Sequence, residues 1–308
     1  MNVVVDGVSK TYGIQKAVSD LSFEVRTGEV LGFLGPNGAG KTTTMKMITQ
    51  CMDVESGDIR VGEWSVLNNG PEIRKHIGYL PENNPLYTEM PVIDYLDFCA
   101  RVQGVPSSEV SNRIREMVGV CGLNREKHKK IGELSKGYRQ RVGLAQAMIH
   151  NPEVLILDEP TTGLDPNQIV EIRKLIKDLG REKTVILSTH ILPEVEATCD
   201  RILIINRGEI VADGTAASLK KQASGKNMVR VRLGGEDLSS VAQTFESWPE
   251  TGRVSALDAA SNLWETEVED VDSFARNLTK TCAAKGWYIV EMSPTETSLE
   301  DIFRGLTL

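Results

Sequence analysis

The sequence predicts an α/β fold with a mostly parallel sheet. Over the first 220 residues, strand-like apolar runs alternate with helical stretches. The runs that carry this prediction are Val30–Leu34, Val154–Leu157, Val185–Leu187 and Ile202–Ile205. Short continuous apolar segments of this kind are typical of strands buried on both faces of a parallel sheet. Two further strand candidates, Val3–Val5 and Leu21–Val25, precede them.

Length and composition narrow the class of protein. The chain has 308 residues, which corresponds to about two domains at about 150 residues each. Its net charge is −8, and we expect no nucleic-acid partner because coating nucleic acid requires a basic surface. No apolar run approaches the roughly 18 residues that span a bilayer, and the N-terminus lacks the apolar block of a signal peptide. The five cysteines form no CxxC pair, which disfavours a disulfide framework or a zinc site and favours a reducing cytosol.

A mostly helical insertion is predicted over residues 85–150. Pro91 opens one helical pattern, and Ser107–Val120 forms a second. Seven basic residues lie within 125–141, against the overall acidic charge of the chain. They indicate either a solvated helix face or the proximity of a polyphosphate or an anionic membrane surface.

A second domain is predicted over residues 221–308, where three of the four tryptophans lie. The polar stretch Lys220–Lys226 is typical of a linker. Strand and helix patterns then follow in the order βαββαβ, and Ser298 with Asp301 resembles a capping box before a last helix. This order predicts a small ferredoxin-like domain. We expect its aromatic residues to form its core rather than a binding surface.

A glycine-rich motif follows the strand Val30–Leu34. The segment Gly35-Pro-Asn-Gly-Ala-Gly-Lys-Thr42 matches GxxxxGK[ST] and precedes a helix that begins near Lys41. Its glycines let backbone N–H groups point at phosphate oxygens, and the helix N-terminus adds partial positive charge. Lys41 is expected to reach the β- and γ-phosphates, and the Thr42 hydroxyl to bind Mg²⁺. The predicted nucleotide-binding residues of this P-loop are Gly35, Pro36, Asn37, Gly38, Ala39, Gly40, Lys41, Thr42 and Thr43.

Two acidic residues follow the strand Val154–Leu157. Asp158 stands at the carboxyl end of this strand, where ligands of open α/β sheets bind, and is expected to hold Mg²⁺. Glu159 is expected to polarise an attacking water, so that hydrolysis needs no covalent intermediate. The pair therefore predicts hydrolysis of a nucleoside triphosphate.

The tract Leu134-Ser-Lys-Gly-Tyr-Arg-Gln-Arg141 distinguishes among the P-loop families. With it the sequence resembles the ABC ATPase family, whose LSGGQ signature binds the γ-phosphate held by the opposite subunit. The resemblance implies this role for Ser135 and Gly137, while Lys136 and Tyr138 replace the Gly and Gln of the signature. It covers about residues 3–220, and it implies that the α/β core is the P-loop NTPase fold of an ABC ATPase domain. Residues 85–150 then form its helical subdomain, followed by the accessory domain.

Three more positions are similar to those of the family. Tyr12 stands where an aromatic ring stacks on adenine, and Asp165 lies in the loop that joins the two sites of the dimer. His190, in Ser188-Thr-His190, corresponds to the histidine that contacts the γ-phosphate. The resemblance thus implies that Glu159 and His190 are catalytic.

One position departs from the family pattern. The family has Gln within Gly-Tyr-x-Pro-Gln, which binds Mg²⁺ and senses the membrane subunit, whereas this chain has Glu82 in Gly78-Tyr-Leu-Pro-Glu82. A carboxylate also offers oxygen to a hard cation, but it adds negative charge beside the triphosphate and Asp158. The Mg²⁺ ligands implied by the resemblance are Thr42, Glu82 and Asp158.

The tract Leu80–Tyr87 and the ending Ser298–Phe303 resemble ATP-binding subunits of gliding-motility-type and other ABC-2 exporters. The resemblance implies two copies that sandwich two ATP molecules, close to drive a separate integral-membrane permease, and reopen on hydrolysis. The chain is then cytoplasmic and peripheral on the inner face of the cell membrane. Two alternatives remain: a soluble ABC ATPase acting on ribosomes or DNA, which the single P-loop and the lack of heptads disfavour, and a slowly hydrolysing nucleotide-gated regulator. Glu159 and His190 disfavour the regulator.

Overall fold

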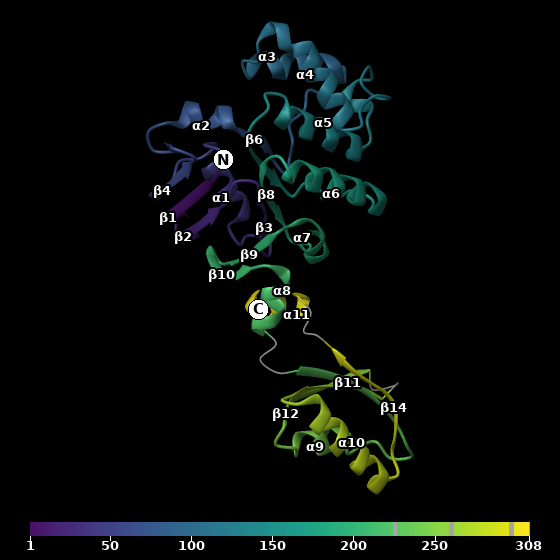
Figure 1. Cartoon of the computed structure of the whole chain (residues 1–308). Coiled ribbons are helices and arrows are strands. Elements are labelled where there is room, and N and C mark those ends of the chain that lie inside the picture. The colour runs from purple at the N-terminus through teal and green to yellow at the C-terminus, as the bar shows by residue number, and fades with distance from the viewer. Residues whose placement is uncertain (224–226, 259–261, 296–298, 308) are drawn as a thin grey trace. The chain divides into compact units, whose positions relative to one another are not determined.

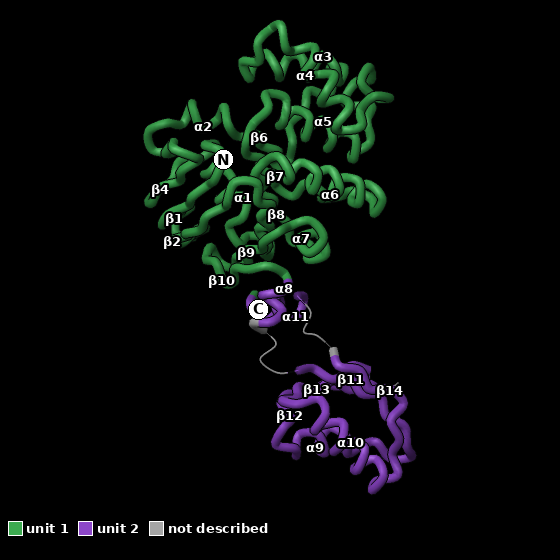
Figure 2. The backbone as a smooth tube through the Cα atoms, in the orientation of Figure 1, with its two compact units in different colours: residues 1–216, 307 green, residues 217–306, 308 purple. Residues whose placement is uncertain are grey.

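The computed structural model in Figure 1 describes residues 1–223, 227–258, 262–295 and 299–307. Contacts between residues divide it into two compact units, residues 1–216 and residues 217–306 (Figure 2). Two buried hydrophobic clusters lie in the first unit and one in the second. None of the described helices is long and apolar enough to cross a membrane.

A six-stranded sheet forms the centre of the first unit, in the order β10-β9-β3-β8-β7-β6. All neighbours are parallel except β10 and β9, which confirms the predicted mostly parallel sheet. The strands are β3 (Val30–Leu34), β6 (Ile77–Leu80), β7 (Val154–Asp158), β8 (Thr184–Thr189), β9 (Arg201–Asn206) and β10 (Glu209–Gly214).

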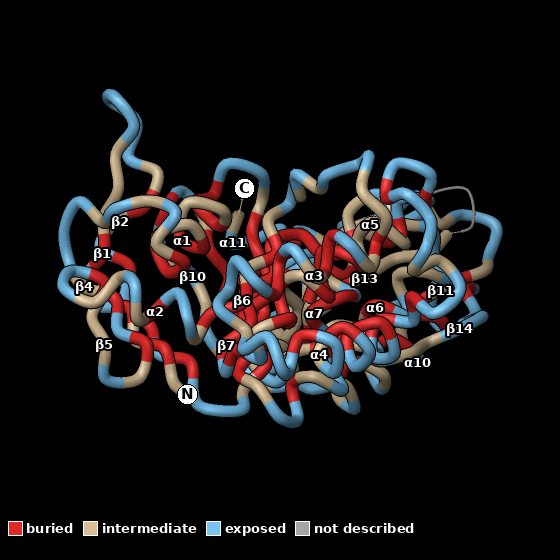
Figure 3. Tube along the Cα trace, turned by 90° about the horizontal axis from the view of Figure 1, so that it is seen from above, coloured by how far each residue is buried: buried red, intermediate tan, exposed pale blue. Residues whose placement is uncertain are grey.

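Both faces of this sheet are covered, as the continuous apolar strands predict. In β7, Leu155 and Leu157 pack into the cluster that contains the helical insertion. Val154 and Ile156, which point the other way, pack into the cluster that contains α1 and a second sheet. Figure 3 shows the resulting band of buried residues around β6 and β7. Packing on both faces therefore fixes the carboxyl ends of these strands, and the loops that follow them begin from fixed positions.

The second sheet of this unit is antiparallel, in the order β2-β1-β4-β5. The first two strand candidates of the sequence belong to it, and both strands run further than those apolar runs because a hairpin joins them at Tyr12 and Gln15. Its strands are β1 (Val3–Tyr12), β2 (Gln15–Val25), β4 (Ser56–Val61) and β5 (Trp64–Ser65). Helices α1 (Lys41–Ile48) and α2 (Gly70–His76) accompany it.

The insertion consists of helices α3, α4 and α5 with one 3₁₀ turn. Helix α5 begins two residues earlier than the sequence pattern indicated, because the Ser135 hydroxyl accepts a hydrogen bond from the Tyr138 N–H and caps the helix. The elements are α3 (Val92–Val102), α4 (Ser107–Val120), η1 (Ile131–Glu133) and α5 (Lys136–Met148). Two further helices complete the unit, α6 (Pro166–Gly180) and α7 (Leu192–Thr198).

In the second unit, a four-stranded antiparallel sheet has the order β12-β13-β11-β14. Phe245, Trp248 and Phe274 pack their rings within 5.5 Å of one another, centroid to centroid, in its core. Its elements are β11 (Asn227–Gly234), α9 (Val241–Glu246), β12 (Thr251–Asp258), β13 (Leu263–Val268), α10 (Val271–Lys285) and β14 (Tyr288–Thr295).

The prediction of a linker over Lys220–Lys226 is wrong for residues 220–223. Helix α8 (Ala216–Ala223) covers residues 220–223, because Leu219 is buried and a polar sequence can form a helix once one apolar side chain packs. Residues 224–226 and the predicted cap Ser298 lie outside the described residues. The predicted last helix is present as α11 (Leu299–Thr307).

Candidate functional site

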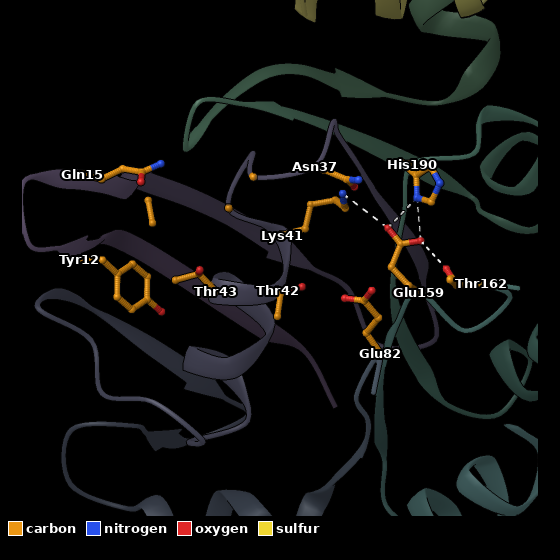
Figure 4. Close-up of a pocket in the computed structure, with 13 residues that line it drawn as sticks. Tyr12, Gln15, Asn37, Lys41, Thr42, Thr43, Glu82, Glu159, Thr162 and His190 are labelled. Carbon is orange, nitrogen blue, oxygen red and sulfur yellow. Dashed lines mark hydrogen bonds and ion pairs between the residues drawn. The ribbon is translucent and has the colours of Figure 1, made fainter. Parts of the chain in front are cut away.

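A pocket of about 460 Å³ opens at the carboxyl ends of β3, β7 and β8 (Figure 4). It brings together most of the residues that the sequence singled out, from segments as far apart as residues 12 and 190. The residues that line it are Tyr12, Gln15, Ala17, Asn37, Gly38, Gly40, Lys41, Thr42, Thr43, Glu82, Glu159, Thr162 and His190. This is where ligands of open α/β sheets bind.

The P-loop curls between β3 and α1 as its glycines predict. Gly38 and Gly40 have φ of +80° and +107°, in the left-handed region that favours glycine. A Cβ on Gly40 would lie 2.5 Å from the Ala17 carbonyl oxygen, so a side chain has no room there. No acidic residue stands in the first turn of α1, so the partial positive charge of its N-terminus faces the pocket uncompensated. This geometry suits a polyphosphate.

Lys41 is held inside this loop. Its ammonium donates to the carbonyl oxygens of Gly35, at 2.8 Å, and Pro36, at 3.3 Å. It also lies 3.6 Å from a carboxylate oxygen of Glu159, and both side chains are buried. Three predicted loop residues, Gly35, Pro36 and Ala39, are outside the pocket lining, and Ala39 is buried and closes a turn by donating its N–H to the Pro36 carbonyl. Lys41 therefore connects the phosphate loop directly to the predicted catalytic carboxylate.

Glu159 meets His190 at the opposite wall. The His190 Nδ1 lies 3.0 Å and 2.9 Å from the two Glu159 oxygens, and the Thr162 hydroxyl donates to Oε2 at 3.2 Å (Figure 4). An ionised carboxylate only accepts hydrogen bonds, so in this contact the His190 Nδ1 carries a proton and donates a hydrogen bond to Glu159. Glu159 has a φ of +50°, which is unusual for a residue with a side chain and is typical of functional sites.

Asp158 lies behind this pair and is completely buried. The Ser188 hydroxyl donates to its Oδ1 at 2.5 Å and accepts from the Glu159 N–H at 3.0 Å, so one serine orients both acidic residues. The Asp158 Oδ2 is buried without a hydrogen-bond partner, as is the hydroxyl of Tyr79. Burial, and then the charge of Asp158, raise the pKa of the Tyr79 phenol, which therefore stays neutral.

The oxygen atoms at this end of the pocket fit Mg²⁺. Mg²⁺ prefers oxygen ligands and is commonly held by one or two carboxylates together with substrate phosphates. A buried carboxylate oxygen without a partner, such as Asp158 Oδ2, is stabilised by such an ion. Thr42 and Glu82 line the same pocket, and Figure 4 shows the Glu82 carboxylate pointing into it. In the described residues, no group of three or more His, Cys, Asp or Glu forms a metal site by itself.

The three predicted binding residues that follow the P-loop in the sequence, Ser135, Gly137 and Asp165, do not line this pocket. Ser135 and Asp165 cap α5 and α6, with Asp165 accepting from the Gln168 N–H at 3.0 Å. A Cβ on Gly137 would lie 2.5 Å from the Gln168 side chain, so α5 and α6 begin side by side. The structure thus places these residues together, outside the pocket that the P-loop of the same chain lines.

Four residues of the site are not predicted by the sequence motifs. Gln15, Ala17 and Thr162 line the pocket, and Ser188 orients the acidic pair. Gln15 pairs with Tyr12 across the β1–β2 hairpin, so recognition of that hairpin would have found it. The Tyr12 hydroxyl donates to the Met52 sulfur at 3.0 Å, which leaves its ring half exposed at the pocket.

A separate apolar groove of about 200 Å³ lies beside α3. Tyr87, Phe98 and Val102 are exposed there, and the Tyr87 ring packs against Tyr95 and Phe98 at 5.8 Å and 5.6 Å. Its lining is Pro85, Tyr87, Tyr95, Phe98, Cys99, Val102, Gln103 and Gln146. The groove begins three residues after Glu82, so the segment that forms one wall of it also reaches the pocket.

Comparison with known proteins gives the family. The ABC transporter family model matches residues 18–162, and the model of the DrrA1-3-like ATP-binding protein C-terminal domain matches residues 214–307. An uncharacterized ABC transporter ATP-binding protein of Bacillus subtilis (strain 168), YxlF, is 34% identical over 300 residues, 97% of each chain. This chain belongs to the ABC transporter ATP-binding proteins. It is an ATPase subunit of an ABC-2-type transporter, as the sequence motifs predict.

Two further matches agree with this ATPase subunit. The bacitracin transport ATP-binding protein BcrA of Bacillus licheniformis is 39% identical over 217 residues, 70% of each chain. A solved ATP-binding subunit of an ABC transporter superposes with a TM-score of 0.66 at 30% identity, over 72% of this chain and 93% of that chain. The predicted ABC ATPase fold is confirmed, and these relatives favour the transporter over the ribosome- or DNA-acting alternatives.

Proposed function

We propose that the pocket of this ATPase subunit binds Mg²⁺-ATP and that Glu159 is the general base of hydrolysis. The carrying observation is the contact of Lys41, Glu159 and His190 within 3.6 Å beside the P-loop. Lys41 and the N-terminus of α1 stabilise the charge of the phosphates. Tyr12 offers a half-exposed ring for the adenine at the other end of the pocket.

In this proposal, Glu159 orients the attacking water and accepts its proton. Its carboxylate is nearly buried, and the hydrogen bonds from His190 and Thr162 hold it in one orientation. His190 stabilises negative charge that develops on the transferred phosphoryl group. Thr42, Glu82 and Asp158 would hold Mg²⁺, which neutralises phosphate charge when bound. The remaining P-loop residues Gly35, Pro36, Asn37, Gly38, Ala39, Gly40 and Thr43 cradle the phosphates.

The second half of each site comes from another copy of the chain in this proposal. Ser135, Gly137 and Asp165 lie together at the starts of α5 and α6 and outside the pocket of their own chain. Two copies arranged head to tail would set these residues against the γ-phosphate held by the partner's P-loop. The domains that would carry these roles are an ATPase domain at 1–220 and a ferredoxin-like accessory domain at 221–308.

The membrane partner is proposed to be a permease that places this subunit on the cytoplasmic face of the cell membrane. The apolar groove beside α3 is the surface that we assign to it, because exposed aromatic residues mark contact sites and the segment after Glu82 reaches the nucleotide pocket. The relative named for bacitracin transport supports a role in transport, and in this proposal the permease chooses the cargo.

The change Glu159→Gln tests the catalytic proposal. An amide cannot accept the proton of water, so ATP turnover of the full-length chain should fall at least about 100-fold. ATP affinity should stay within about threefold, because the P-loop contacts remain, and ATP should then accumulate a dimer visible by size-exclusion chromatography. The matched control is Glu153→Gln, a half-exposed carboxylate paired with His76 outside the pocket. Parental turnover in Glu159→Gln would exclude Glu159 as the base. It would also remove the argument from Glu159 against a slowly hydrolysing, nucleotide-gated regulator.

A further inference from the structure

Glu194 is a buried carboxylate close to the catalytic pair, but it does not line the pocket. It lies in the first turn of α7, and its side chain is 3% exposed. The Thr161 hydroxyl donates to Oε1 at 2.6 Å, and the Thr189 hydroxyl donates to Oε2 at 2.8 Å. The Arg173 guanidinium on α6 lies 3.7 Å away and supplies positive charge. A charge buried this deeply is retained only where such partners satisfy it.

The partners of Glu194 flank the two predicted catalytic residues. Thr161 follows Glu159 by two positions, and Thr189 directly precedes His190. The Thr189 hydroxyl also accepts from the Ile191 N–H at 3.1 Å, so it spans the backbone on both sides of His190. One carboxylate therefore joins the loop after β7 to the end of β8, the two segments that must hold Glu159 and His190 in contact.

The same carboxylate reaches α6. Arg173 lies on this helix, whose N-cap is Asp165 at the predicted contact with the second subunit. The Arg173 Nε is buried without a hydrogen-bond partner, and the guanidinium forms an ion pair with Glu194. The two hydrogen bonds to Glu194 come from Thr161 and Thr189. Neither residue lies on β1, which carries Tyr12, or in the P-loop and α1.

We propose that Glu194 is a positioning residue for ATP hydrolysis, holding Glu159 and His190 in register with each other and with α6. This inference rests on the catalytic roles proposed above for Glu159 and His190. It follows that loss of Glu194 lowers turnover without weakening ATP binding, because the P-loop and Tyr12, which are proposed to hold the phosphates and the adenine, lie on other elements.

The test is Glu194→Gln in the full-length chain. The amide keeps the shape of the side chain but offers one acceptor oxygen in place of two, so one threonine hydroxyl loses its partner. We expect kcat to fall about tenfold or more, because small displacements of catalytic groups have large effects on rate. The dissociation constant of ATP should stay within about twofold.

Two further variants separate positioning from general stability. Glu29→Gln removes another nearly buried carboxylate, paired with Arg201 at 2.9 Å and outside the pocket, and should leave kcat within about twofold. In Arg173→Gln combined with Glu194→Gln, kcat should be no more than about twofold below Glu194→Gln alone, because the two residues act in one network.

Three outcomes would overturn the inference: parental kcat in Glu194→Gln, an equal loss of ATP affinity and kcat, or an equal loss of kcat in Glu29→Gln. Its failure is distinct from failure of the proposed function. If Glu159→Gln stops turnover and Glu194→Gln does not, only the positioning role of Glu194 is wrong. If Glu159→Gln keeps turnover, the catalytic assignment itself is wrong.

Discussion

Glu82 is the residue at which this chain differs from the usual pattern of its family. Its carboxylate lines the nucleotide pocket together with Thr42 and Glu159, and Asp158 lies behind them. Three carboxylates thus surround the place proposed for the γ-phosphate. With Mg²⁺ bound, Glu82 and Asp158 would contribute oxygen ligands, whereas without it the negative charges of all three carboxylates oppose the phosphates.

The change Glu82→Gln should therefore make ATP affinity depend less steeply on free Mg²⁺. Glu82 is exposed to solvent in the pocket, so screening limits the effect to about 1 kcal/mol, or about fivefold in affinity between Mg²⁺-free and Mg²⁺-saturated conditions. Titration of ATP binding at several free Mg²⁺ concentrations measures it.

The matched control is Glu89→Gln, in which the lost carboxylate pairs with Lys130 at the surface and lies outside the pocket. Superimposable Mg²⁺ curves for the parent and Glu82→Gln would contradict metal tuning. Glu82 would then act only as the start of the segment that leads to the groove beside α3.

At the scale of elements, the groove beside α3 is the surface that we propose for contact with the permease. Its walls are α3, α5 and the segment that enters the insertion, and its exposed large apolar residues are Tyr87, Phe98 and Val102. Burial of apolar surface contributes about 25 cal/mol per Å² of favourable free energy. Contact of a partner helix with this patch is therefore favourable. A permease segment seated there would touch the same stretch of chain that carries Glu82.

A photoreactive benzoylphenylalanine in place of Phe98 should therefore form an adduct with a multi-span membrane protein in intact cells. Mass spectrometry of the adduct from the membrane fraction identifies the partner. The same substitution at Leu67, which is also exposed but lies outside the groove, is the control and should give no such adduct. Adducts of the Phe98 variant only with a second copy of this chain would show that the groove is a dimer contact.

At the scale of the whole molecule, the nucleotide pocket belongs to the first unit alone. All its lining residues lie between Tyr12 and His190, well before the division after Ala216. The second unit has its own aromatic core and its own sheet. We therefore expect the second unit to influence the transporter through contacts with other chains rather than through the ATP pocket.

A chain that ends at Thr215, before α8, should bind ATP within about threefold of the full-length protein. Equilibrium binding with a fluorescent ATP analogue measures this, and circular dichroism checks that the shortened chain folds. Loss of ATP binding from a shortened chain that still folds would show that the second unit is needed to complete the pocket.

Local chemistry made part of this protein predictable from its sequence. The glycines of the P-loop allow one tight conformation, and Gly40 adopts a φ of +107° as expected. Doubly buried apolar strands also had to form the parallel sheet, which puts Asp158 at its ligand-binding edge. The ends of α5 and of the linker were wrong by a few residues, because the cap at Ser135 and the packing of Leu219 depend on neighbours.

The sequence by itself determined the phosphate loop, the acidic pair after β7 and the parallel core, since each depends on backbone conformations and apolar patterns that are local. Only the tertiary structure decided which of these groups meet. Lys41 contacts Glu159, Glu159 contacts His190, and Glu194 joins three elements across separations of 5 to 33 residues. Such contacts form where strands of one sheet end together, and the spacing of residues along the chain carries no record of that register.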